Sequence, residues 1–76
     1  MIKEVKKEDF TQGFVLGMKA EETVLVLTDK FSDYEVARQK VANAKKRCEL
    51  PEGIADYTCE RTEGNKALVK AVGINN

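Results

Sequence analysis

The sequence predicts an α+β fold in which a single helix packs on a small antiparallel sheet, with the elements in the order β-β-α-β-β. Two patterns predict this class: one segment has apolar residues at helical spacing, and the segments around it alternate or form short β-branched runs. A helix with one apolar stripe can cover one face of an antiparallel sheet of about four strands. The chain has 76 residues, so we expect one small domain spanning residues 1–76.

The helix is predicted over residues 33–48. Its apolar positions are spaced by three and four residues, which places them on one stripe of an α-helix. These positions are Tyr34, Ala37, Val41, Ala44 and Cys48. The stripe is the side that we expect to pack on the sheet.

Signals at both ends delimit this helix. Ser32 is the expected N-cap, and Glu35, three residues later, completes a capping box. Phe31 and Val36 have the spacing of a hydrophobic staple across that cap. The Pro-x-Gly segment at residues 51–53 stops the helix shortly after its last turn.

Residues 14–28 are predicted to form a β-hairpin. Its second strand, residues 23–28, is an uninterrupted β-branched and apolar run, typical of a buried or at least central strand. In its first strand, alternate residues place three apolar side chains on one face: Phe14, Leu16 and Met18. Residues 19–22 have the length of a hairpin connection.

After the helix, a half-buried strand is predicted. In this strand Ala55, Tyr57 and Cys59 alternate with polar residues and are expected to face the core. Residues 62–66 follow as a turn, in which the Gly64-Asn65 pair can adopt positive φ angles.

The last strand, residues 66–74, has two alternative sets of inward-facing side chains. One set is Leu68, Val72 and Ile74, and the other is Val69 with the alanines. Lys70 shares a face with the first set, which favours the second set as the core face. At the other end of the chain, residues 2–10 fit either a strand or a short helical turn.

Charge and composition exclude several function classes. The chain has 13 basic and 13 acidic residues, no histidine and a pI near 6.3. This balance argues against a protein that binds duplex DNA or an anionic membrane by charge alone. The chain has no phosphate-binding loop, no dinucleotide-binding glycine motif and no nucleophile elbow. We therefore expect no enzymatic activity, no catalytic residues and no cofactor.

The two cysteines, Cys48 and Cys59, do not indicate a metal site. A structural zinc site needs four ligands, and the chain has no histidine and no further cysteine. The first residues mix both charge signs without an apolar signal segment, and no apolar run approaches the length of a membrane span. We therefore expect a cytoplasmic protein with reduced thiols. In an exported protein, a Cys48–Cys59 disulfide is the alternative.

Charge is segregated along the chain although the total is zero. Residues 30–48 hold six basic and two acidic residues, a net +4, whereas residues 49–65 hold one basic and five acidic residues, a net −4. A basic helix end followed by an acidic segment is a candidate two-signed docking surface. Its predicted partner-binding residues are Arg38, Lys40, Lys45, Lys46, Arg47, Glu49 and Glu52. The simpler interpretation is solvated charge that complements the helix dipole.

The predicted function is that of a small protein-binding module that is not an enzyme and that blocks a site on its partner sterically. The strand before the helix, the Ser32-Asp33-Tyr34-Glu35 helix start and the return to a strand after residues 51–53 resemble the layout of several compact bacteriophage proteins that bind and inhibit host machinery. The resemblance spans residues 14–61 and implies a phage or mobile-element inhibitor or adaptor. It concerns layout and carries no functional residue across.

Two alternatives accompany this prediction. One is a small nucleic-acid-binding regulator that uses the sheet face and the basic residues 45–47. The other concerns oligomeric state. The strand face that turns away from the helix has few polar side chains within residues 24–27, so either the N-terminal segment or another chain is expected to cover it. A homodimer through an exposed sheet face or edge is one such arrangement.

Overall fold

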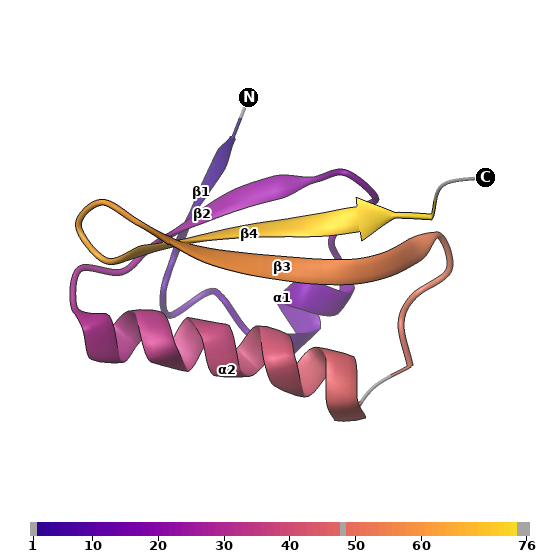
Figure 1. Cartoon of the computed structure of the whole chain (residues 1–76), viewed down its shortest axis with the longest axis horizontal. Helices are drawn as coiled ribbons and strands as arrows, with labels where there is room; N and C mark the ends of the chain where they lie inside the picture. The colour runs from indigo at the N-terminus through magenta and orange to yellow at the C-terminus, as the bar shows by residue number, and fades with distance from the viewer. Residues whose placement is uncertain (1, 48, 75–76) are drawn as a thin grey trace.

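The computed structural model describes residues 2–47 and 49–74. Its elements follow the order β-α-β-α-β-β (Figure 1). They are β1 (Lys3–Lys6), α1 (Gln12–Leu16), β2 (Thr23–Leu27), α2 (Phe31–Arg47), β3 (Ile54–Thr62) and β4 (Lys66–Gly73). No helix in this described part of the chain has the length and apolar character needed to cross a membrane.

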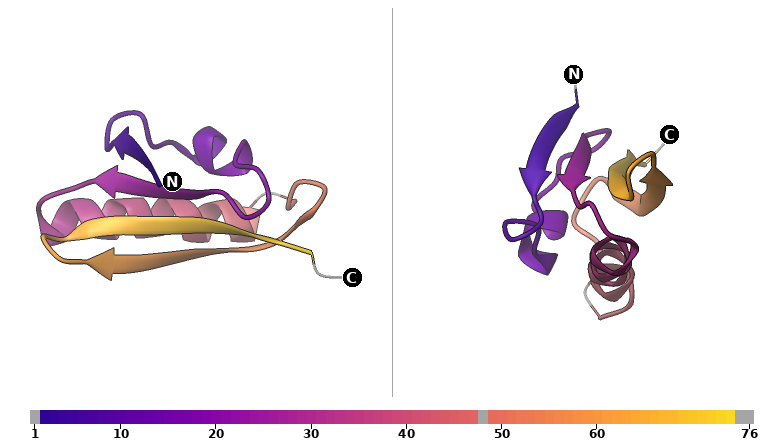
Figure 2. Two further views of the ribbon diagram at one scale, coloured as in Figure 1. Left: turned by 90° about the horizontal axis from the view of Figure 1, so that it is seen from above. Right: turned by 90° about the vertical axis from the view of Figure 1, so that its left-hand side faces the viewer.

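The four strands form one sheet in the order β1-β2-β4-β3. Both helices lie on the same side of this sheet, which we call the inner face; the opposite side is the outer face (Figure 2). The predicted α+β class, with one main helix on a small sheet, is confirmed. The predicted purely antiparallel pairing is wrong for β1, which runs parallel to β2. The chain crosses over through α1 between these strands, and such a crossover leaves them parallel.

The hairpin predicted over residues 14–28 is wrong in its first half, which forms α1. Thr11 caps this helix, because its Oγ1 accepts a hydrogen bond from the Phe14 N–H at 3.1 Å. Val15 and Met18 are buried, whereas Phe14 is only half-buried, so the predicted alternation is absent. An apolar run this short fits a helix as well as a strand, and the cap at its start favours the helix.

The predictions for β2 and for residues 2–10 agree with the structure, the first in full and the second in part. β2 is central, between β1 and β4, as its β-branched run indicates. Val24 and Val26 are fully buried on the inner face, whereas Leu25 is half-buried and Leu27 is exposed. Both alternatives for residues 2–10 are present in part, since β1 is followed directly by a turn.

α2 buries its predicted stripe. The buried positions are Tyr34, Ala37, Val41 and Ala44. The fifth predicted member of the stripe, Cys48, lies outside the described residues, and so does the alternative Cys48–Cys59 disulfide. This helix covers the inner face opposite β3 and β4 (Figure 1).

The start of α2 differs from the prediction. The Tyr34 N–H bonds to the Lys30 carbonyl at 3.0 Å, so Lys30 has the cap position and Ser32 lies in the first turn. Phe31 and Val36 are 50% and 52% exposed and therefore form no staple. The Phe31 ring packs against Tyr34 instead, with the ring centroids 5.9 Å apart.

β4 presents the favoured set of side chains to the core. Ala67, Val69 and Ala71 are fully buried, which confirms the register chosen because of Lys70. In β3, Tyr57 is buried and Cys59 is half-buried, as predicted. Ala55 is exposed, because a β-bulge shifts the register between Ile54 and Asp56 and turns that side chain away.

The turn between β3 and β4 has the predicted conformation. Gly64 and Asn65 have φ angles of 79° and 60°. The buried hydroxyl of Thr28, directly after β2, donates a hydrogen bond to the Asn65 carbonyl. This bond ties the tip of the hairpin to the end of the central strand.

Replacing Tyr57 tests the packing of the core. Its hydroxyl is buried and has no hydrogen-bond partner among the described residues, and burial raises the pKa of the phenol. An unpaired buried hydroxyl opposes folding, so Tyr57→Phe should raise the free energy of unfolding by about 1 kcal/mol in urea titrations. Val69→Ala, the control, should lower it by about 2 kcal/mol. A loss of stability in Tyr57→Phe would contradict the absence of a partner.

Candidate functional site

The seven predicted partner-binding residues fall into two groups, those with partners within the protein and those without. Arg38 belongs to the first group. Its Nη2 lies 2.8 Å from the Glu35 carboxylate, one turn earlier on α2. The hydrogen bond and the charge of Glu35 raise the pKa of the Arg38 guanidinium. Both side chains stay accessible at the surface.

Lys40 and Lys45 tie α2 to other parts of the fold. The Lys40 ammonium donates a hydrogen bond of 2.8 Å to the Phe10 carbonyl and so holds the segment between β1 and α1. The Lys45 ammonium lies 3.0 Å from the Asp56 carboxylate and 3.3 Å from the Tyr57 carbonyl. The hydrogen bonds from Lys45 and from the Tyr57 N–H lower the pKa of Asp56. These two lysines therefore have structural partners.

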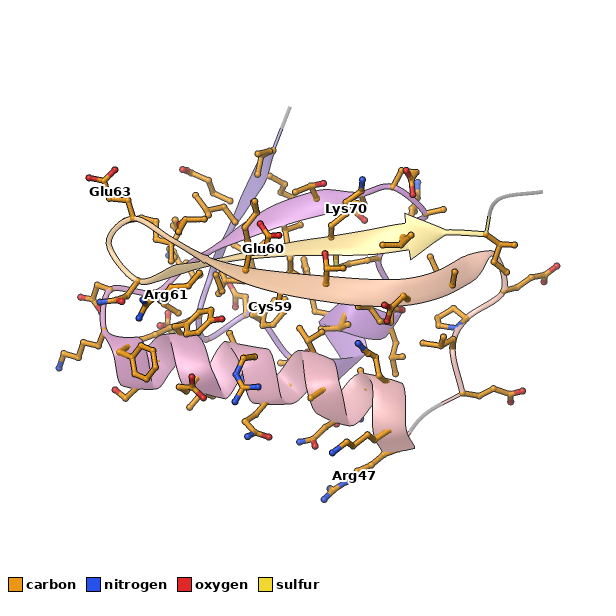
Figure 3. The ribbon with its side chains drawn as sticks, viewed as in Figure 1. Arg47, Cys59, Glu60, Arg61, Glu63 and Lys70 are labelled. Carbon is orange, nitrogen blue, oxygen red and sulfur yellow. The ribbon has the colours of Figure 1, made fainter. Side chains whose placement is uncertain are left out.

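The remaining four residues form the exposed end of α2 and the loop after it. They are Lys46, Arg47, Glu49 and Glu52. Within the described residues, none of the four makes an ion pair or a side-chain hydrogen bond. Arg47 points away from the sheet at the end of the helix (Figure 3). Three of the seven predicted residues thus have partners within the fold, and these four are left exposed at the end of α2 and in the loop after it.

The outer face carries a second candidate surface. Its centre is a row of four residues that lie side by side across all four strands: Glu4, Leu25, Leu68 and Glu60. We call this set the central row. Two leucines stand in its middle and a carboxylate stands at each end. Since neighbouring strands are about 4.8 Å apart, the row is about 14 Å long.

Lysines and further apolar side chains surround the central row. On β1, Lys6 lies two residues after Glu4. On β4, Lys66 and Lys70 lie two residues before and after Leu68, so all three lysines share the outer face. Figure 3 shows Glu60 and Lys70 pointing away from α2. Leu27 is 38% exposed beside Leu25. No described element covers this face (Figure 2).

Sequence reasoning singled out this face but not its pattern. The apolar composition of β2 predicts that the N-terminal segment or another chain covers the outer side, and the N-terminal segment does not, because β1 joins the sheet and α1 lies on the inner face (Figure 2). The central row, however, joins residues from four separate strands, and its order depends on the strand order β1-β2-β4-β3. The favoured register of the last strand places Leu68 away from the core, and this is the sequence signal that points to one member of the central row.

A shallow groove of about 310 Å³ lies between α2 and the free side of β3. Its lining is Arg38, Val41, Ala42, Lys45, Asp56, Tyr57, Thr58 and Cys59. Burial raises the pKa of the Cys59 thiol to about 11, so this side chain is an uncharged thiol at neutral pH. Among the described residues, no cluster of three or more carboxylate or thiol groups is placed to hold a metal ion.

Comparisons with known proteins add no relative. No family model matches the chain, and searches of curated proteins and of solved structures found no significant match.

Single Lys→Met substitutions distinguish a lysine that has a partner within the protein from one that has none among the described residues. Lys40→Met keeps the aliphatic stem but removes the ammonium that binds the Phe10 carbonyl. It should lower the free energy of unfolding by about 1 kcal/mol. Lys46→Met, the matched control, should change it by less than about 0.5 kcal/mol. Equal losses in urea unfolding would show that the Lys40 bond does not stabilise the fold.

The thiol of Cys59 predicts a loss of stability in alkali. Its pKa is raised from 9.0 to about 11 in the folded protein. A group with a raised folded pKa stabilises the fold fully below its unfolded pKa, and this contribution is lost as the pH rises toward the folded value. Between about pH 9 and about pH 11, Cys59→Ala should therefore lose less stability than the parent protein. Parallel pH profiles from thermal melts would contradict this assignment.

Proposed function

We propose that this chain is a non-enzymatic protein-binding module whose outer face docks on a partner protein and occludes a site there. The observation that carries the proposal is the uncovered central row, with Leu25 and Leu68 paired between two glutamates. Open sheet faces with apolar side chains are a common form of protein interaction site. A phage or mobile-element inhibitor or adaptor is the class that the layout suggests.

The composition of the outer face suits a protein partner. An apolar centre surrounded by polar and charged groups is the usual anatomy of an interface between proteins. Here the centre is Leu25, Leu27 and Leu68, and the charged rim includes Glu4 and Glu60. The backbone under these side chains is a paired sheet, so docking orders few additional groups.

A nucleic-acid-binding regulator is the second candidate. Lys6, Lys66 and Lys70 on the outer face favour it, since each can contact a phosphate. Two glutamates at the ends of the central row oppose phosphate binding. None of the described strand residues on this face is aromatic, so they form no stacking platform like that of single-strand binders.

Paired variants in affinity capture test the proposed docking surface. Leu25→Thr combined with Leu68→Thr places β-branched residues, which favour strands, at both positions but removes the apolar centre. Partner proteins captured from lysate should be enriched at least about tenfold less by this variant, because two central apolar contacts are lost. Quantitative mass spectrometry measures the enrichment, and thermal melts confirm that the variant is folded.

The matched control replaces both Lys46 and Arg47 by Thr at the end of α2. It should capture the same proteins as the parent chain. Loss of capture in the control alone would move the docking surface to the helix end. Capture that neither variant changes would reject both surfaces. Steep salt-dependent binding to nucleic acid, weakened by removing Lys66 or Lys70, would favour the second candidate.

A further inference from the structure

β3 is a nine-residue edge strand, and its free side has open main-chain groups. At Tyr57 the N–H donates to the Asp56 carboxylate and the carbonyl accepts from Lys45, so both groups point away from β4. The residue opposite Tyr57 on β4 is Ala71. Its N–H donates to the Glu22 carbonyl and its carbonyl accepts from the Glu21 N–H, both on the β2 side. Tyr57 and Ala71 are therefore a pair without hydrogen bonds between them.

The same orientation recurs at every second residue of an antiparallel strand. The register from residue 57 to residue 62 has no shift. Cys59 and Arg61 thus direct their N–H and carbonyl groups to the open edge. No hydrogen bond to these four groups is found within the described residues. Unpaired edge groups of this kind are a template for an additional strand.

The groove beside this edge is lined in part by small side chains and is covered at one end. Ala42 on α2 and Cys59 on β3 are two of these small lining residues, and they leave room for side chains of an added segment. The ion pair of Lys45 with Asp56 covers the Tyr57 end. This cover limits strand addition to the stretch opposite Cys59 and Arg61.

The charges along the groove favour an acidic occupant. The guanidinium of Arg61 stacks 5.1 Å from the centroid of the exposed Phe31 ring and has no carboxylate partner among the described residues. Arg38 lines the groove; its guanidinium is paired with Glu35, and both side chains remain accessible. Cys59 itself is an uncharged thiol and adds no negative charge. Arg61 lies two residues beyond Cys59 on the same face of β3, next to the groove, and is the cation there without a carboxylate partner among the described residues.

We propose that the free edge of β3 binds an extended acidic peptide segment as an added antiparallel strand, with an acidic side chain between Arg38 and Arg61. Antiparallel addition is favoured because it pairs slightly better per residue than parallel addition. Main-chain bonds supply the affinity and the groove selects the alternate side chains. This site is separate from the outer face, so it does not depend on the proposed function.

The probe is the capped peptide acetyl-Val-Thr-Glu-Thr-amide, which ends before the covered Tyr57. With its Glu opposite Cys59, the Val lies opposite Arg61 near Phe31, and both Thr side chains face the outer side. Titration of the full ¹⁵N-labelled chain should shift the amide signals of Cys59 and Arg61 in a saturable manner at millimolar peptide. Arg38→Gln should weaken binding about two- to fivefold, as for an exposed ion pair. Lys46→Gln should leave it unchanged.

N-methylation separates strand addition from simple charge attraction. A methyl group on the Glu nitrogen removes a donor that faces β3 and should abolish the shifts. The same methyl group on the second Thr nitrogen faces solvent and should not. Equal binding of both methylated peptides, or no shift at either residue, would overturn the proposal. Shifts confined to the outer face, or shifts that depend only on protein concentration because a second copy pairs there, would overturn it as well.

Discussion

The fold depends on a close approach of α2 to one face of the sheet, which small side chains permit. β4 presents Ala67 and Ala71 to this contact, and α2 presents Ala37 and Ala44, all at most 3% exposed. Because protein interiors are densely packed, larger side chains at these positions would push the helix away and open the core. Both helices gather on this face, and the opposite face has no described cover (Figure 2). The open outer face is thus a consequence of how the core is packed.

Charged side chains have different roles in so small a protein. Lys40 and Lys45 reach carbonyl groups on neighbouring segments, and Lys7 pairs with Asp33 at 3.0 Å between the turn after β1 and the start of α2. Exposed ion pairs contribute little by themselves, so Lys40 and Lys45 stabilise the fold mainly through their bonds to carbonyl groups. The cations at the end of α2 are left for the solvent or for a partner.

The two edges of the sheet are protected to different degrees. β1 has only four residues, and short edge strands are poor templates for further pairing. β3 has nine residues, and at one end the bulge near Asp56 and the Lys45 ammonium protect its edge. Its other end offers main-chain groups at Cys59 and Arg61. The outer face and this edge are therefore distinct surfaces with different chemistry, one with an apolar centre and a charged rim and one with open main-chain groups.

Elements whose signals lie within one segment can be predicted from the amino-acid sequence. The buried stripe of α2, the positive φ angles at Gly64 and Asn65 and the inward set of β4 all follow from local spacing or from the stereochemistry of one residue. The parallel pairing of β1 with β2 and the partners of Lys45 become visible only in the folded chain. The tertiary structure also assembles the central row from four strands. These features join residues far apart in the chain, and local periodicity contains no information about which distant segments become neighbours.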